Sequence, residues 1–235
     1  MQAIIMAAGK GSRLGMLTED KPKSFLEING EKLIEHNIRL LQKYGINDII
    51  IVTGYHDTDF YELFGGTDGI SFVYNPYYEF VNVLGSFYLA RNELNDDFVY
   101  LHADTLCEES IFEELLNHLG DIVLPVDMKP CDDEAMKVKI DKDKKIIYIN
   151  KQMDGKDAFG EFIGFMKIKK PVIPDLIDIT ENLLRKKVYN AYFEAAIQEI
   201  INMKKFDVRY FTTAGRFWAE IDFLEDYERA CKEMK

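Results

Sequence analysis

Glycines and cations stand close together in one short segment near the start of the chain, and this combination suits phosphate binding. The segment reads Ala7-Ala8-Gly9-Lys10-Gly11-Ser12-Arg13-Leu14 and is followed by Lys21-Pro22-Lys23. Glycine lets the backbone bend and approach a ligand, so that free N–H groups can point at phosphate oxygens. Arg13 and Lys23 add full positive charge. The segment therefore predicts a polyphosphate-binding loop, although the glycines alone also fit a plain tight turn.

Two other phosphate-binding motifs fit this segment poorly. The P-loop pattern Gly-x-x-x-x-Gly-Lys-Ser/Thr lacks its first glycine here. In the dinucleotide fingerprint Gly-x-Gly-x-x-Gly, the third glycine position holds Leu14, and Gly15 comes one residue late. A nicotinamide-dependent oxidoreductase is therefore the weaker alternative.

Two carboxylates far from this loop have the chemistry of magnesium ligands. Asp104 follows an apolar strand-like run, and Asp222 stands in Trp218-Ala219-Glu220-Ile221-Asp222. Mg²⁺ prefers oxygen and is held by one or two carboxylates together with phosphate oxygens. The alternative for each residue is capping the helix that follows it. Together with the glycine loop, the pair predicts a Mg²⁺ site beside a bound triphosphate.

The elements that must position these residues alternate between strands and helices in the first half. The pattern of apolar residues predicts strands at 3–6, 48–53, 70–74 and 97–102, and helices at 33–44, 58–64, 84–94 and 108–119. Such alternation predicts an α/β fold with a doubly wound parallel sheet. Ligands of these sheets bind at the carboxyl ends of the strands, where the glycine loop and Asp104 both lie.

The second half has a different pattern, with more consecutive strands. Strands are predicted at 122–126, 136–140, 145–150, 163–168 and 208–211, and helices at 175–185, 191–203 and 225–234. The turn at 141–144 favours an antiparallel hairpin. Because the chain has no internal repeat and no low-complexity linker, we expect a single domain over 1–235, with halves of about 1–120 and 121–235.

Composition limits the classes of partner. A net charge of −12, from 41 acidic and 29 basic residues, argues against binding a nucleic-acid polymer but not against a single nucleotide. The three cysteines, Cys107, Cys131 and Cys231, have no paired or metal-like spacing, which favours a reducing compartment. No apolar stretch approaches the ~20 residues that cross a bilayer, and no signal peptide is evident. We expect a cytoplasmic protein without membrane insertion.

The segment from Ala7 to Lys23 resembles the signature of the sugar-nucleotide pyrophosphorylase-like nucleotidyltransferases, Ala-Ala-Gly-x-Gly-Ser/Thr-Arg-Leu followed by Pro-Lys. Met16 departs from it, because such proteins usually carry proline there. The resemblance implies a Rossmann-like, doubly wound, mostly parallel sheet with a smaller mixed β/α acceptor subdomain. It also implies roles for the matching residues: nucleotide binding by Ala7, Ala8, Gly9, Gly11 and Ser12, catalysis by Arg13 and Lys23, and Mg²⁺ binding by Asp104 and Asp222.

A second segment narrows the resemblance to one group within these nucleotidyltransferases. Residues 82–90 look like the Asn-x-x-x-Ser-x-Tyr-Leu segment of small cytidylyltransferases that activate phosphocholine or aminoethylphosphonate. The resemblance gives Asn82 and Ser86, which share a helical face, a role in nucleotide binding. Helix capping is the alternative for both residues. The choice of CTP over other nucleotides rests on this resemblance alone.

The same group of enzymes is similar to this chain at three positions of the second half. The resemblance implies that Lys151 binds the acceptor phosphate and that Glu161 and Glu194 bind a positively charged part of the acceptor. Solvated surface roles are the alternatives for all three. An amine on the acceptor would also suit the acidic run 132–134, which otherwise reads as a solvated loop. His102 is the one histidine near a predicted site residue, and a structural role at its strand end is favoured.

The activity implied by the resemblance is Mg²⁺-dependent coupling of CTP to a small phosphorylated or phosphonylated molecule, with release of pyrophosphate. The product would feed cell-surface or capsule decoration. Two alternatives stay open: a nucleotidyltransferase that joins another nucleotide to a sugar 1-phosphate, and a nucleotide sensor without catalysis. The sequence also leaves a homodimer open.

Overall fold

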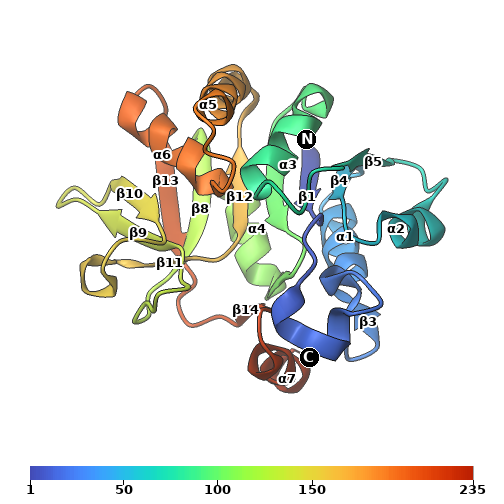
Figure 1. The fold of residues 1–235 in the computed structure, drawn as a ribbon. Helices are drawn as coiled ribbons and strands as arrows, with labels where there is room; N and C mark the ends of the chain where they lie inside the picture. Colours follow the sequence, from blue (N-terminus) through green and yellow to red (C-terminus); the bar gives the residue numbers. More distant parts are fainter. Residues whose placement is uncertain (235) are drawn as a thin grey trace.

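One mixed sheet of ten strands runs through both halves of the chain (Figure 1). The computed structural model describes residues 1–234. The strand order is β10-β9-β11-β8-β12-β6-β1-β4-β5, and β13 lies beside β8. The strands are β1 (Gln2–Met6), β4 (Asp48–Thr53), β5 (Ile70–Tyr74), β6 (Phe98–His102), β8 (Ile122–Asp127), β9 (Lys137–Ile140), β10 (Ile146–Asn150), β11 (Gly160–Phe162), β12 (Phe165–Ile168) and β13 (Val208–Thr212).

The first half forms the parallel part of the sheet, as predicted. Strands β5, β4, β1 and β6 lie side by side and all pairs among them are parallel. Strand β1 is central and buried throughout, with Ala3, Ile4 and Ile5 fully inaccessible to solvent. A strand covered on both faces needs such a continuous apolar run. This order confirms the doubly wound α/β prediction and sets the carboxyl ends of β1 and β6 side by side.

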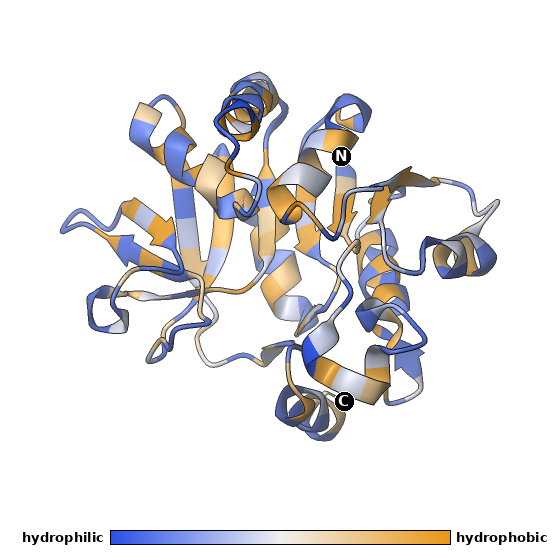
Figure 2. Ribbon diagram, in the orientation of Figure 1, coloured by the Kyte–Doolittle hydropathy of each residue, from blue (hydrophilic) through white to orange (hydrophobic). Residues whose placement is uncertain are grey.

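Helices cover both faces of the sheet. Successive side chains of β1 point to opposite faces, and each set packs against different helices. Ile4 and Met6 pack in one apolar cluster with α3, α5 and α6, whereas Ala3 and Ile5 pack in another with α1 and α4. Figure 2 shows that apolar residues are frequent along the strands of the sheet and recur along the helices that cover it. The helices are α1 (Leu33–Lys43), α2 (Asp57–Phe64), α3 (Val83–Ala90), α4 (Glu109–Asn117), α5 (Ile173–Arg185), α6 (Phe193–Met203) and α7 (Leu224–Glu233).

The second half joins the same sheet through antiparallel strands. Strand β12 pairs with β6, and β11 and β12 pair with opposite ends of β8. The predicted single strand at 163–168 is therefore wrong in detail, since β11 ends at Phe162 and β12 begins at Phe165. Gly164 separates them with φ +88°, a conformation that interrupts a strand and favours glycine. The predicted hairpin is confirmed, as β9 and β10 are antiparallel across the turn at 141–144.

Two small sheets complete the fold. Strands β2 (Glu27–Ile28) and β3 (Glu31–Lys32) form one, and β7 (Thr105–Cys107) pairs with β14 (Trp218–Glu220) in the other. The second pairing brings the carboxy-terminal segment against the end of β6. Among the described helices, none combines the length and apolar composition needed to cross a bilayer. The cysteines Cys107, Cys131 and Cys231 form no disulfide within this part of the chain.

Candidate active site

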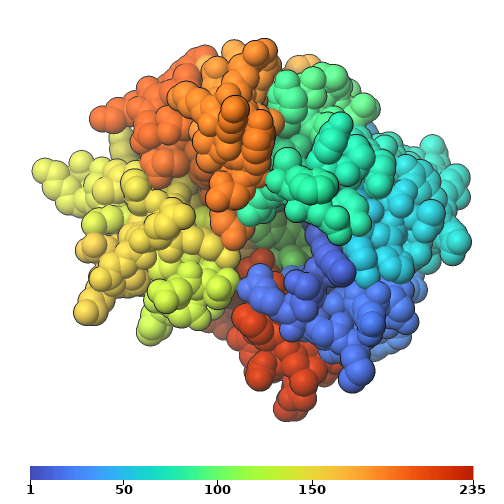
Figure 3. Space-filling model, in the orientation of Figure 1, coloured from blue at the N-terminus to red at the C-terminus, as the bar shows by residue number. Residues whose placement is uncertain are grey.

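A pocket of about 330 Å³ opens at the carboxyl ends of β1 and β6. Figure 3 shows a hollow at the centre of this face, between the blue amino-terminal segment, the green segment and the red carboxy-terminal segment. The pocket is lined by the glycine loop, by the start of α3, and by residues that follow β6 and β14. Its lining includes Ala7, Ala8, Gly9, Gly11, Ser12, Arg13, Lys23, Asn82, Ser86, His102, Asp104, Lys151, Tyr192, Glu220 and Asp222.

The glycine loop leaves β1 and presents an open backbone to the pocket. No atom of the protein lies within 4 Å of where a Cβ on Gly9 would stand, so a ligand can approach the chain there. Gly11 has φ +64°, and a Cβ at this position would lie 2.8 Å from Cβ of Lys23. Both the left-handed backbone and the contact with Lys23 therefore require glycine at position 11.

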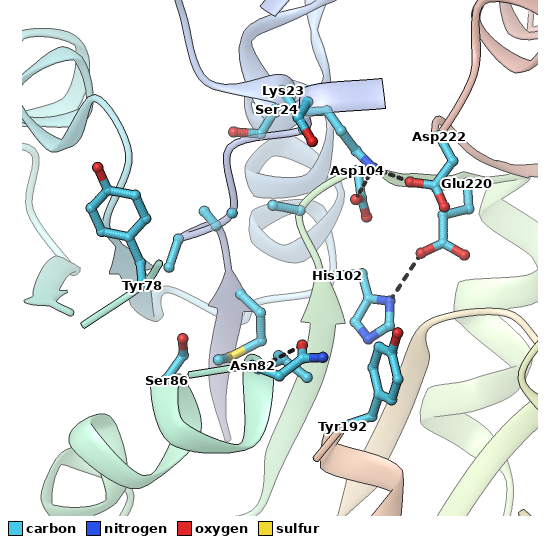
Figure 4. Close-up of a pocket in the computed structure, with 18 of the residues that line it drawn as sticks. Lys23, Ser24, Tyr78, Asn82, Ser86, His102, Asp104, Tyr192, Glu220 and Asp222 are labelled. Carbon is cyan, nitrogen blue, oxygen red and sulfur yellow. Dashed lines mark hydrogen bonds and ion pairs between the residues drawn. The ribbon is translucent and has the colours of Figure 1, made fainter. Parts of the chain in front are cut away.

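Lys23 lies between the two predicted metal ligands (Figure 4). Its Nζ is 2.5 Å from Oδ2 of Asp104 and 2.5 Å from Oδ1 of Asp222. Burial alone would lower the pKa of Lys23, but the two carboxylates outweigh burial and raise that pKa above its ordinary value. Lys23 is thus a permanent cation at the pocket wall. The other Asp104 oxygen, Oδ1, is buried without a hydrogen-bond partner and can accept a further ligand.

Strand pairing, rather than helix capping, accounts for the positions of the two aspartates. Strand β14 pairs with β7 directly after Asp104, with Glu220 opposite Thr105. Helix α4 has Glu108 at its N-cap position, and the Asp226 carboxylate accepts hydrogen bonds from the N–H groups of Asp222 and Phe223 at the start of α7. Neither Asp104 nor Asp222 caps a helix, so both carboxylates are available to the pocket.

Two further cations lie across the pocket mouth from each other and share one acidic partner. Arg13 Nη2 is 3.1 Å from Asp222 Oδ2, and its Nη1 is 3.1 Å from Glu134 Oε2. Lys151 Nζ is 3.5 Å from the same Glu134 oxygen and 4.9 Å from the centre of the Tyr192 ring. Both cations that line the pocket here are therefore paired with carboxylates in this structure.

His102 forms the floor of the pocket and contacts buried acids. Its Nδ1 is 3.5 Å from Glu220, its Nε2 is 3.7 Å from Glu194, and the Tyr100 hydroxyl lies 3.1 Å from Nε2. Burial by itself would lower the pKa of His102, but Glu220 and Glu194, with a smaller contribution from Asp104, raise it to about 9. The imidazole is therefore an imidazolium at neutral pH.

The start of α3 forms the opposite wall. Asn82 Oδ1 accepts a hydrogen bond of 2.7 Å from the N–H of Val83, so Asn82 caps the helix as well as lining the pocket. Ser86 Oγ accepts a hydrogen bond of 2.9 Å from the Asn75 side chain. In Figure 4 Asn82 and Ser86 lie across the pocket from Lys23.

Glu161 and Glu194 do not line this pocket. Glu161 is paired with Lys129 at 2.6 Å, and the Lys129 ammonium lies 4.6 Å from the centre of the Trp218 ring. Burial raises the pKa of Glu161, although Lys129 opposes this shift. Glu194 is 1% exposed and lies behind His102, with neither carboxylate oxygen hydrogen-bonded. Burial raises its pKa as well, and the acceptor roles of both residues stay predictions.

Comparison with known proteins assigns the chain to a family. Residues 3–138, more than half of the chain, match the MobA-like NTP transferase domain. The chain belongs to this family. The resemblance to nucleotidyltransferases seen in the glycine loop is thereby confirmed, and the dinucleotide-dependent oxidoreductase is not favoured.

Relatives that match this NTP transferase over nearly their full length include two cytidylyltransferases. The CTP:phosphoglutamine cytidylyltransferase of Campylobacter jejuni is 28% identical over 97% of this chain and 98% of its own length. The choline-phosphate cytidylyltransferase of Streptococcus pneumoniae is 29% identical, and the match covers 100% of this chain and 99% of that enzyme. The similarity therefore extends beyond the family domain into the second half.

Solved structures agree with this fold. The CTP:phosphocholine cytidylyltransferase from Streptococcus pneumoniae superposes with a TM-score of 0.79 at 25% identity, over 100% of this chain and 99% of that one. The inositol-1-phosphate CTP transferase from T. maritima has the same fold, with a TM-score of 0.79 at 24% identity over 99% of this chain and 96% of its own.

The structure of this NTP transferase brings most of the predicted site residues together and adds several. The glycine loop, Arg13, Lys23, both aspartates, Lys151 and the α3 residues all line one pocket. The sequence predicted no role for Glu220 or Tyr192, and for His102 it favoured a structural role over a role in the site. The spacing His102-x-Asp104 after a strand and Glu220-x-Asp222 near the end contained a signal, because alternate residues of an extended chain face the same side.

Proposed function

We propose that this NTP transferase is a Mg²⁺-dependent cytidylyltransferase that couples CTP to a small phosphorylated or phosphonylated acceptor and releases pyrophosphate. One observation carries the proposal: Lys23 lies between Asp104 and Asp222 at the edge of the open glycine loop. The full-length similarity to two CTP-dependent enzymes supports the choice of reaction. Neither relative is named for transfer of a nucleotide to a sugar 1-phosphate, so a sugar 1-phosphate nucleotidyltransferase is the less favoured activity.

The proposed chemistry is an in-line displacement at phosphorus. An oxygen of the acceptor phosphate attacks the α-phosphorus of CTP, the bond to the β-phosphate oxygen breaks, and pyrophosphate leaves. The acceptor phosphate is already an anion, so the step needs no general base. Positioning and charge neutralisation are the main contributions of the protein in such transfers. Backbone N–H groups from Ala8 to Ser12 would hold the phosphates, since the Ala7 N–H already donates to the Val52 carbonyl, while Arg13 and Lys23 would neutralise the charge that develops.

Asp104 and Asp222 are the residues that would hold Mg²⁺. Their oxygens already enclose one cation, the Lys23 ammonium, and the buried Oδ1 of Asp104 has no hydrogen-bond partner. This oxygen-rich, acidic set fits the preference of Mg²⁺ for carboxylates and phosphate. When bound, the ion supplies positive charge to phosphate oxygens. Lys23 would then turn from the carboxylates toward the phosphates.

The acceptor would bind on the second half of the chain. Lys151 lines the pocket and would contact an acceptor phosphate. Glu161 and Glu194, which do not line the pocket, would contribute negative potential toward a cationic acceptor group. Phosphocholine carries a quaternary ammonium, and 2-aminoethylphosphonate and a phosphorylated amino acid carry an amine that is protonated at neutral pH, whereas a phosphorylated amide would offer a neutral polar group. Asn82 and Ser86, on the other wall, would contact the nucleoside.

The test is pyrophosphate release from each of CTP, UTP, ATP and GTP with each of these acceptors and with a sugar 1-phosphate, in the presence of Mg²⁺ and of excess EDTA. The proposal expects turnover with CTP and at least one of these acceptors, and none with EDTA. Turnover only with a sugar 1-phosphate would support the alternative activity. Absence of turnover with every nucleotide, combined with tight CTP binding, would support a nucleotide sensor.

The wider role is part of the proposal. An enzyme that consumes CTP would work in the cytoplasm, and an activated acceptor would serve the decoration of a cell-surface polysaccharide or capsule. Light scattering of the purified protein tests the homodimer that the sequence left open.

A further inference from the structure

One acidic side chain occupies the space between two cations that the proposed function assigns to phosphates. Glu134 lies on the loop between β8 and β9, and its Oε2 is 3.1 Å from Arg13 Nη1 and 3.5 Å from Lys151 Nζ. In Figure 3 the yellow-green segment that contains this loop lies next to the blue glycine segment at the rim of the hollow. The contact joins the two halves of the chain across the pocket mouth.

The local structure holds this carboxylate against two cations that line the pocket. The N–H groups of Glu134 and Ala135 both donate to Asp132 Oδ1 at 3.0 Å, which fixes the turn. The buried Lys137 ammonium donates to the Ala135 carbonyl at 3.3 Å and to the Lys151 carbonyl at 2.8 Å. One buried cation therefore holds the loop and Lys151 in a fixed relation, while the Glu134 side chain itself is 59% exposed and free to turn away.

The chemistry of the contact is that of a phosphate group. A carboxylate oxygen between a guanidinium and an ammonium makes the same charge-assisted contacts as a phosphate oxygen. Arg13 and Lys151 line the pocket, and no other acidic side chain within the described residues pairs with Lys151. Glu134 thus stands where a substrate anion would have to bind.

We propose that Glu134 is an intramolecular competitor for the substrate phosphates, displaced when an anion binds between Arg13 and Lys151. This inference rests on the proposed function, since it concerns the affinity of the same site. Displacement breaks two exposed ion pairs, and pairs of this kind change an equilibrium by a small factor each. Removing the charge should therefore tighten anion binding about two- to tenfold. An opposite role, in which Glu134 orients Arg13 for the substrate, would make the same change weaken binding.

The test compares Glu134→Gln with Asp133→Asn, a matched control. Asp133 is exposed on the same loop and makes no ion pair or side-chain hydrogen bond in the described chain. Isothermal titration with inorganic tripolyphosphate, without Mg²⁺ and at low salt, reports the anion site independently of nucleotide and acceptor. We expect tripolyphosphate to bind about two- to tenfold more tightly to Glu134→Gln than to the wild type, and the control to change far less.

Three results would overturn the inference: weaker binding to Glu134→Gln, an equal change in the Asp133→Asn control, or no tripolyphosphate binding to either variant or the wild type. The pyrophosphate-release assay separates this failure from failure of the proposed function. Tighter binding by Glu134→Gln without turnover would retain the competitor and reject the cytidylyltransferase. Turnover without any specific effect of Glu134→Gln would reject the competitor and retain the cytidylyltransferase.

Discussion

The backbone N–H of Ile221 donates a hydrogen bond of 3.0 Å to the carbonyl oxygen of Asp104. This bond continues the pairing of β14 with β7, in which Glu220 lies opposite Thr105. It places Asp222 beside Asp104, although the two are far apart in the sequence. Because Lys23 then joins both carboxylates, three distant segments of the chain meet at one point of the pocket wall.

Replacing Lys23 should reduce both activity and stability. Lys23→Met removes the cation that would neutralise the transferred phosphate, and we expect kcat to fall about 100-fold or more. It also leaves Asp104 without a cation and Asp222 with Arg13 alone, which should lower the free energy of unfolding by about 2–3 kcal/mol. Steady-state kinetics and urea denaturation measure the two effects.

Lys21→Met is the matched control, because Lys21 makes no ion pair among residues 1–234 and lies two positions earlier. It should leave both quantities nearly unchanged. Equal losses in the two variants would show that Lys23 acts only through general surface charge.

Substitutions at two glycines of the same loop distinguish the effect of backbone strain on activity from the effect of displacing Lys23. Gly11 and Gly15 have φ +64° and +55°, so alanine is strained at both positions. Gly11 has ψ 35°, where alanine is strained by about 1–2 kcal/mol, whereas Gly15 has ψ −127°, a conformation that side chains rarely adopt. Only at Gly11 would the new Cβ meet Lys23, because, its chain neighbours aside, no described residue has an atom within 4 Å of a Cβ at Gly15. We expect Gly11→Ala to lower kcat by about tenfold more than Gly15→Ala, although both variants lose thermal stability. Equal kcat values would contradict the positioning of Lys23 by this contact.

Asp222→Asn should change the response to Mg²⁺. With one of the two proposed ligands neutral, the Mg²⁺ concentration for half-maximal activity should rise about tenfold or more. The control is Glu225→Gln on the first turn of α7, an exposed acid that faces no pocket residue. A Mg²⁺ titration of pyrophosphate release measures the effect. An unchanged titration for Asp222→Asn would exclude this residue as a metal ligand.

The ion pair between Glu31 and Arg39 should make the free energy of unfolding depend on pH. The Arg39 guanidinium donates to Glu31 at 2.7 and 2.8 Å and lowers the pKa of that carboxyl, despite an opposing effect of burial. The stabilisation is therefore present above the ordinary pKa of glutamate and is lost as the pH falls through the lower, folded value. At about pH 7 Glu31→Gln should lower the free energy of unfolding by about 0.5–1 kcal/mol, and at about pH 3 by much less.

Urea denaturation at the two pH values measures this difference. Glu27→Gln is the control on the neighbouring strand β2, since the Glu27 side chain has no hydrogen-bond partner in the described chain. A loss for Glu31→Gln that is as large at the acidic pH would contradict the assignment.

Most of the fold followed from local patterns in the sequence. The apolar runs of β1, β4 and β6 and the spacing of α1 contain enough residues to define a period. The strand around Gly164 was predicted as continuous, because a single glycine in a strand does not reveal its φ angle. Strands β7 and β14 have three residues each, too few for any period to be visible.

The site residues that belong to a sequence motif were predictable. Those that reach the site only through tertiary contacts were not. The glycine loop, Asp104 and Asp222 have fixed positions relative to strands or motifs. The link between His102 and Glu194 depends on how α6 packs over β6, and sequence spacing does not contain that packing. Glu134 reads as part of a solvated acidic run, because nothing local indicates that Arg13 and Lys151 lie on either side of it.

A crystal structure of the protein grown with CTP and Mn²⁺, with anomalous scattering to locate the metal, tests the proposed metal and triphosphate sites most directly. We expect a metal peak bound by Asp104 and Asp222, the triphosphate on the backbone between Ala7 and Arg13, and Lys23 in contact with phosphate. A metal peak away from both aspartates, or a triphosphate outside the pocket between β1 and β6, would contradict it.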